Sequence, residues 1–203
     1  MTMQLNERPR GGRRWSFDRD AAIETAMLLF WRHGYEGVAV GDLTKAIGVA
    51  PPSLYAAFGS KAGLYERALA RYEEKIGRLD TERIGSSKSL PDAVRVLLES
   101  AVKTVTHRHD ERGCMISSGG VACHPDHAAV ARDAAERREA LRLQIMRALA
   151  PFADGDQLHR LSRHLSAVMQ GISIQARDGI GARELYDLVD DVVEGVSARL
   201  ANR

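Results

Sequence analysis

The sequence is poor in the residues that build several common kinds of protein. Two cysteines in 203 residues are too few for a disulfide framework. Aromatic residues make up only 5% of the chain, which argues against a stacking platform for RNA or single-stranded DNA. No apolar run approaches the ~20 residues of a membrane span. The basic N-terminus leads into charged residues instead of an apolar segment, so we predict no secretory signal and expect a cytoplasmic location.

The sequence also lacks the motifs that most enzymes need. We find no paired carboxylates, no nucleophile elbow and no phosphate-cradling glycine loop, and Gly119-Gly120 is too short to count as one. No stretch alternates apolar and polar residues as a half-buried strand would. We therefore predict an all-α protein that is not an enzyme and holds no cofactor.

Charge is nearly balanced over the whole chain but not along it. The formal net charge is only +2, yet the first 62 residues hold 8 lysines and arginines against 6 acidic residues, and the remainder holds 21 of each. Most of the excess lies in residues 1–15, where four arginines, Arg13 and Arg14 among them, accompany one glutamate. Such an arm suits phosphate or minor-groove contact, although a solvated leader is the simpler alternative.

Residues 38–64 are the most informative stretch. Gly48 stands where a first short helix must stop, because a left-handed residue costs glycine no Cβ clash. Pro51 then occupies the first position of the next helix, where a missing N–H is harmless. Both helices share one apolar set, which comprises Leu43, Ile47, Val49, Leu54 and Phe58. Two short helices joined by such a turn form a helix-turn-helix, which places its second helix in the DNA major groove.

Helical periodicity covers most of the remaining chain. Ser16 or Asp18 can cap a helix that ends near His33, and Ser60 caps a linking helix over 60–78 that fades towards residues 85–87. Loops rich in glycine, serine and histidine separate the elements that follow. Further helices are expected over about 89–105, 115–123 and 127–149.

The last two helices carry the strongest periodic signal, and a short connection over 178–181 predicts an antiparallel pair. Each apolar stripe is wider than one partner helix requires. Two ordinary core helices would explain this, but a palindromic DNA site needs a two-fold protein, so we predict a four-helix dimer interface. Its predicted residues are Leu161, Leu165, Val168, Leu185, Leu188, Val192 and Val196.

Residues 17–69, FDRDAAIETAMLLFWRHGYEGVAVGDLTKAIGVAPPSLYAAFGSKAGLYERAL, closely resemble the N-terminal domain of TetR/AcrR-type transcriptional repressors. The GY turn, the SLY…F helix and the SK…L helix start carry the resemblance, and GCM at 113–115 and QGISIQARDG at 170–179 look like one branch of that family. The resemblance implies a three-helix DNA-binding domain, a linking helix, and a C-terminal domain that dimerises and holds a small-molecule pocket.

The resemblance also implies which residues contact DNA. Ser53 and Tyr55 match positions that approach bases and phosphate, Lys61 matches a phosphate contact at a helix N-terminus, and Thr44 and Lys45 lie where backbone contact is expected.

Several residues depart from the family pattern. Ala39, Gly41 and Ala57 replace a cap and two residues that can be polar, and Pro51 and Pro52 remove two backbone donors. We therefore expect Pro52 and Ala56 to contact thymine methyl groups and Arg13 and Arg14 to read A·T-rich flanks.

Two constellations compete for the effector site. One is an apolar pocket between the middle helices, lined by some of Tyr72, Ile76, Leu97, Ala101, Cys114, Met115, Met146, Met169 and Ile172, although methionines at helical spacing also serve as core filler. The other is a cluster of thiols and imidazoles that includes His107, His109, Cys114, Cys123, His124 and His127. Its spacing lacks a C-x-x-C pair, so we predict no metal site, and a buried, inert thiol is the simplest reading of Cys114.

These observations together predict a dimeric repressor that binds double-stranded operator DNA and is released by a small-molecule effector. The predicted organisation is a basic arm (1–15), a helix-turn-helix domain (16–62) and an effector-binding and dimerisation domain (63–203). A switch driven by metal or thiol oxidation at the Cys114/Cys123/histidine cluster, a DNA binder without an effector, and an enzyme are the alternatives.

Overall fold

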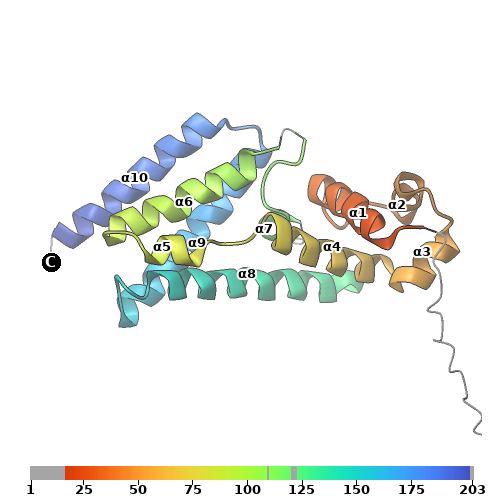
Figure 1. Cartoon of the computed structure of the whole chain (residues 1–203), viewed down its shortest axis with the longest axis horizontal. Coiled ribbons are helices and arrows are strands. Elements are labelled where there is room, and N and C mark those ends of the chain that lie inside the picture. The colour runs from red at the N-terminus through yellow and green to blue at the C-terminus, as the bar shows by residue number, and fades with distance from the viewer. Residues whose placement is uncertain (1–16, 109, 120–122, 202–203) are drawn as a thin grey trace, which may run out of the picture.

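The computed structural model describes residues 17–108, 110–119 and 123–201. Every regular element within these ranges is a helix and none is a strand, as predicted (Figure 1). No helix within them is long and apolar enough to cross a membrane. The elements are α1 (Arg19–His33), α2 (Val40–Ile47), α3 (Pro51–Phe58), α4 (Lys61–Lys75), α5 (Thr81–Gly85), α6 (Leu90–Thr106), α7 (Met115–Ser118), the 3₁₀ turn η1 (Pro125–His127), α8 (Ala128–Leu149), α9 (Gly155–Arg177) and α10 (Ala182–Ala201).

Short polar side chains start four of the helices, α1, α4, α5 and α6, by accepting hydrogen bonds from otherwise unpaired N–H groups. Asp18, the second of the two predicted caps, accepts from Asp20 N and Ala21 N at the start of α1. Ser60 accepts from the N–H of Gly63 at 3.0 Å and so starts α4, as predicted. α2 begins differently, because Ala39 has no side-chain acceptor and only the Asp42 carboxylate closes the turn, accepting from Ala39 N at 2.8 Å.

The linking helix is shorter than predicted. It leaves helical geometry at Ile76 because Gly77 packs directly on the ring of Tyr72, where a Cβ would lie 2.7 Å from Cε1. Asp80 then caps the separate helix α5 by accepting from Arg83 N. The predicted helix over 115–123 is shorter too, since the described part of it ends at Ser118.

Two hydrophobic cores lie side by side. The N-terminal core packs α1 against α2, α3 and α4, and it also takes in Met115 and Ile116 of α7, far along the chain. The C-terminal core joins α5, α6, α8, α9 and α10. Cys114 packs against both cores, so the segment before α7 is the joint between them.

The predicted antiparallel pair is only partly realised. α6 packs against both α9 and α10, and the two last helices touch each other at few positions (Figure 1). Leu165 and Leu185 are completely buried in the C-terminal core, so they have no surface to offer a second copy, contrary to our prediction. Val196 is 7% exposed and packs in the same core, but it also borders a surface groove. Four predicted interface residues remain partly exposed: Leu161, Val168, Leu188 and Val192.

Candidate nucleic-acid interface and effector cavity

The helix-turn-helix is built around one left-handed glycine. Gly48 adopts φ 78° and ψ 34°, and its N–H and that of Val49 both donate to the carbonyl of Thr44. This closes α2 and sends the chain back into α3, as the position of the glycine predicts. Arg19 fixes α3 from the other side, because its guanidinium donates to Ala57 O at 3.0 Å and lies over the Phe58 ring.

One face of α3 is open to solvent. Tyr55 is 46% exposed, Pro52 and Ala56 are exposed, and Ser53 is half-buried. Ala57 is only 7% exposed because it faces the N-terminal core, so it is not part of the reading surface, contrary to our expectation from the family pattern. The open face thus presents a phenol, a proline ring and a methyl group, with few polar atoms.

The N-termini of α3 and α4 differ in what they offer to an anion. Pro51 and Pro52 have no N–H, and the N–H groups of Ser53 and Leu54 both donate to Ala50 O. α3 therefore presents no spare donors in its first turn. At α4 the Ser60 hydroxyl engages only Gly63 N, and helix geometry leaves the first two N–H groups without an intrahelical acceptor. The start of α4 is accordingly suited to a phosphate.

Lys61 lies at this α4 terminus in an unusual setting. Its ammonium sits 4.1 Å from the centre of the Tyr35 ring, and partial burial lowers its pKa, while Glu36 opposes the shift. The Glu36 carboxylate accepts from His124 N and pairs with Nδ1 of His127 at 2.7 Å, and these two contacts lower the pKa of Glu36. Lys61, which we predict to contact phosphate, therefore interacts electrostatically with the same carboxylate that binds the loop before α8.

The remaining predicted DNA contacts have mixed outcomes. Lys45 is exposed on α2, and Gly41 lies beside open space, where a side chain would meet no atom within 4 Å. Thr44 is only 9% exposed and its hydroxyl donates to Gly41 O, so its side chain is not available to DNA. Arg13 and Arg14 lie outside the described residues.

A cavity opens where α4, α6, α7, α8 and α9 meet. Its volume is about 50 Å³, and Tyr72, Ala101, Cys114 and Met169 line it as predicted. The other five predicted residues do not line it. Leu97 and Ile172 are buried in the C-terminal core, Met115 is buried in the N-terminal core, Ile76 packs against the N-terminal core, and Met146 is partly buried elsewhere on α8.

The histidine and cysteine cluster is spread over several surroundings. Cys114 lies on the cavity wall, whereas Cys123 lies near Glu36 and Lys61, and burial and the Glu36 charge raise its pKa. His127 Nδ1 is engaged by Glu36. Among the described residues, no three histidine, cysteine or acidic side chains gather as metal ligands, and His109 falls outside them.

Sequence reasoning missed the bonds that join α1 to the segment before α7. The buried indole Nε1 of Trp31 donates to Gly113 O at 2.8 Å, and Arg177 of α9 donates to Trp31 O at 2.7 Å. Glu111 is 4% exposed and pairs with Arg32 at 2.5 Å and with Arg108 at 2.7 Å. The only signal was the bulky Trp31 at the end of α1, since the segment itself has no periodic pattern.

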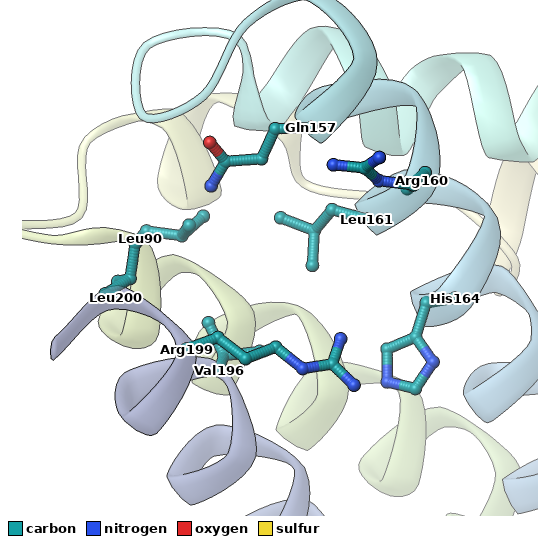
Figure 2. A pocket seen from close by; sticks show the side chains of 8 residues that line it. All are labelled: Leu90, Gln157, Arg160, Leu161, His164, Val196, Arg199 and Leu200. Atoms are coloured by element: carbon teal, nitrogen blue, oxygen red, sulfur yellow. The ribbon is translucent and has the colours of Figure 1, made fainter. Parts of the chain in front are cut away.

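A groove lies between α9 and α10, closed at its base by the start of α6. Its volume is about 180 Å³, its apolar floor includes Leu90, Leu161 and Val196, and Arg160, His164 and Arg199 stand around it (Figure 2). A second, shallower hollow of about 260 Å³ continues it along α10 past Leu188, Asp191, Val192 and Gly195.

Comparisons with known proteins agree with this geometry. Residues 22–68 match the family model of bacterial regulatory proteins, tetR family. The HTH-type transcriptional repressor ComR of Escherichia coli (strain K12) is 30% identical over 187 residues, which cover 87% of this chain and 88% of that protein. BdcR, an HTH-type transcriptional repressor of the same organism, is 34% identical over 181 residues, 86% of each chain.

A solved structure is similar over nearly its full length. It is that of the TetR family transcriptional regulator CifR, a variant with three cysteines replaced, complexed with a 26-bp double-strand operator DNA. The fold superposes with a TM-score of 0.80 at 34% identity, covering 90% of this chain and 98% of that one.

Proposed function

This chain belongs to the tetR family of bacterial transcriptional regulators, DNA-binding proteins that are not enzymes, and from that premise we propose that it is a two-fold repressor released from its operator by a small molecule. The observation that carries this proposal is that an exposed α3 face and a donor-rich α4 N-terminus lie at one end of the molecule, while a lined cavity lies at the opposite end of the same helix α4.

The proposed reading of DNA divides between two helices. Tyr55, Pro52, Ala56 and Ser53 of α3 would meet base edges and thymine methyl groups, and the α4 terminus with Lys61 would hold a phosphate. Lys45 of α2 would contact the backbone, and the arm with Arg13 and Arg14 would reach the minor groove. Tyr55 is open enough for its hydroxyl to reach a phosphate or a base.

Footprinting on the DNA that flanks the gene of this protein would identify the operator, and variants then test the contacts. Lys61→Ala should lower affinity about ten-fold for every sequence and reduce the slope of log affinity against log salt by about 0.9. Lys88→Ala, at an exposed lysine before α6, is the control and should leave both unchanged. Unchanged affinity of Lys61→Ala would remove this residue from the phosphate contacts.

We propose that the second copy binds over the groove between α9 and α10. The N-terminal half of α9 is rich in cations and the outer side of α10 is rich in acids, so two copies related by a two-fold axis can pair opposite charges. The basic side chains are Arg160 and Arg163, with His159 and His164 beside them, and the acids are Asp187, Asp191 and Glu194. Arg199 and His164 face one another across the groove, so a carboxylate from the partner could accept hydrogen bonds from the Arg199 guanidinium there (Figure 2).

The oligomeric state tests this part directly. Val192→Glu places a charge in the middle of the proposed interface and should yield monomers in sedimentation experiments, whereas Lys88→Glu should not. A dimer that survives Val192→Glu with unchanged stability would move the interface elsewhere.

The proposed effector occupies the cavity between α4, α6 and α9. Because α4 links this cavity to the helix-turn-helix, a ligand that prefers a different α4 position would change the separation of the two reading helices. Operator affinity measured with and without candidate ligands tests this step, and a repressor that no ligand releases would favour a DNA binder without an effector.

A second candidate is a switch at the Cys114 thiol. Cys114 lines the cavity and packs on both cores, and its N–H donates to the buried Ser173 hydroxyl at 2.8 Å, so modification of the sulfur would disturb the joint between the cores. Cys114→Ser should leave release by a non-covalent ligand intact; lost release would favour the thiol switch.

A further inference from the structure

Tyr72 lines the effector cavity, and its side chain ends in a buried hydroxyl. Tyr72 is completely buried and lines the cavity, yet among the described residues its oxygen has no hydrogen-bond partner of ordinary geometry. An unpaired buried hydroxyl is unfavourable by about 1–3 kcal/mol, so such a group calls for an explanation.

The surroundings of this hydroxyl show what it lacks. Two groups interact with it as weak hydrogen-bond partners: the N–H of Met115, which can only donate, and the Cys114 thiol, a weak acceptor. Burial raises the pKa of Tyr72 well above its ordinary value, so the group remains a neutral O–H donor. A good acceptor for that proton is what is missing.

The rest of the cavity wall offers little else to a polar ligand. Leu79, Ala101, Val105, Leu141 and Met169 supply apolar surface. The Thr104 hydroxyl already donates to Ser100 O at 2.9 Å. Arg78 is exposed at the rim, so no ionised side chain lies inside. A volume of about 50 Å³ leaves room for roughly four to six non-hydrogen atoms.

We propose that the Tyr72 hydroxyl is the polar anchor of this cavity, and that the effector is a small, uncharged, mostly apolar molecule with one acceptor oxygen, such as a ketone. This inference rests on the proposed function and names the chemistry of its effector. The ligand oxygen accepts the phenolic proton, and its hydrocarbon part displaces water from the apolar wall.

Tyr72 also connects the cavity to the DNA-binding end. Its ring packs edge-on against Trp31 of α1 with centroids 4.9 Å apart, and the Trp31 indole holds Gly113 O, next to Cys114 on the cavity wall. A ligand that moves the Tyr72 side chain would therefore shift α1 as well as α4. Both helices pack in the core of the helix-turn-helix.

A matched pair of probes tests the anchor. Cyclopentanone and methylenecyclopentane have nearly the same shape, but only the ketone has an acceptor oxygen. Titrations of the full chain labelled with ¹³C-methyl methionine would follow the Met169 signal, which reports on the cavity wall. Tyr72→Phe removes only the hydroxyl. Tyr65→Phe is the matched control, since Tyr65 also has a buried, unpaired hydroxyl but does not line the cavity.

We expect cyclopentanone to bind about five-fold more weakly to Tyr72→Phe than to the natural chain or to Tyr65→Phe, and methylenecyclopentane to bind all three alike. Equal ketone affinity of Tyr72→Phe, or a Met169 signal that neither probe moves, would overturn the anchor. Operator affinity with each probe separates the two proposals: binding without release contradicts only the proposed function, and release that is undiminished in Tyr72→Phe contradicts only the anchor.

Discussion

The two cores of this protein are built from different materials. The N-terminal core contains two groups of packed aromatic rings, Phe30 with Tyr35 and Tyr65, and Trp31 with Tyr72, and two of its hydroxyls have no described partner. The buried residues of the C-terminal core are all aliphatic.

This difference indicates which part of the molecule would change conformation when a ligand binds. The buried aliphatic side chains of the C-terminal core are stabilised only while they remain closely packed, and a close-packed interior resists compression. We therefore regard this core as the rigid part of the molecule. A buried tyrosine hydroxyl without a hydrogen-bond partner, in contrast, is stabilised by a ligand that supplies an acceptor. We therefore assign the moving part of the molecule to α1, α4 and the segment before α7.

The largest effect is expected from a substitution that creates a cavity in the aliphatic core, which tests whether that core takes part in the ligand response. Leu97→Ala, at a completely buried position on α6, should lower the free energy of unfolding by about 3 kcal/mol, measured in urea. The folded fraction should still bind operator and release it normally, because Leu97 does not line the effector cavity. A selective loss of ligand response would blur the division between base and moving part.

The aromatic core can be disturbed at the bond between Trp31 and Gly113. Trp31→Phe removes the indole N–H, leaves Gly113 O unpaired and should lower the free energy of unfolding by about 2 kcal/mol. Unlike Leu97→Ala, it should also weaken ligand-induced release, since α1 loses its tie to the cavity wall. Release that is as complete as in the natural chain, measured by operator binding, would argue against signalling through α1.

Two substitutions that each delete one buried hydroxyl should have opposite signs. Tyr72→Phe removes an unpaired group and should raise the free energy of unfolding by about 1 kcal/mol in the ligand-free protein. Ser173→Ala removes the acceptor of Cys114 N–H and should lower it by about 1 kcal/mol. Equal signs in parallel urea titrations would mean that the Tyr72 hydroxyl is satisfied after all.

The smallest effect concerns pH and the joint between the cores. Burial alone would raise the pKa of Glu111, but its bonds to Arg108 and Arg32 outweigh burial and place the pKa below its usual value. A lowered pKa stabilises the folded state above the unfolded value, about 4.3, and this contribution disappears as the pH falls through the folded value. Glu111→Gln should therefore flatten the loss of stability below about pH 4.3, seen as a smaller shift in Tm.

Local features of the fold were predictable and long-range ones were not. Gly48, Ser60 and Pro51 set helix ends through their own backbone chemistry, and their neighbours in sequence suffice to read them. The apolar stripes on α9 and α10 could not show which residues face the core of the same chain and which face outward, because Leu165 and Leu188 look alike in sequence. The answer depends on α6, which packs against both helices.

The candidate site divides in the same way. The exposed residues of α3 follow from helical periodicity, whereas the cavity wall combines five helices, and only four of nine predicted residues line it. The contacts of Trp31 and Glu111 join residues about 80 positions apart through a segment without regular pattern. No sequence signal of a single chain encodes such a pairing.

The two prolines at the start of α3 separate attachment from reading. A helix whose first turn has no spare N–H offers few donors of its own to the DNA backbone, so in the proposed complex the α4 terminus would set its alignment. The outward residues of α3 can then change without disturbing that alignment. This makes α3 an exchangeable module: a library at Pro52, Tyr55 and Ala56 should yield regulators for new operators that keep the same effector response.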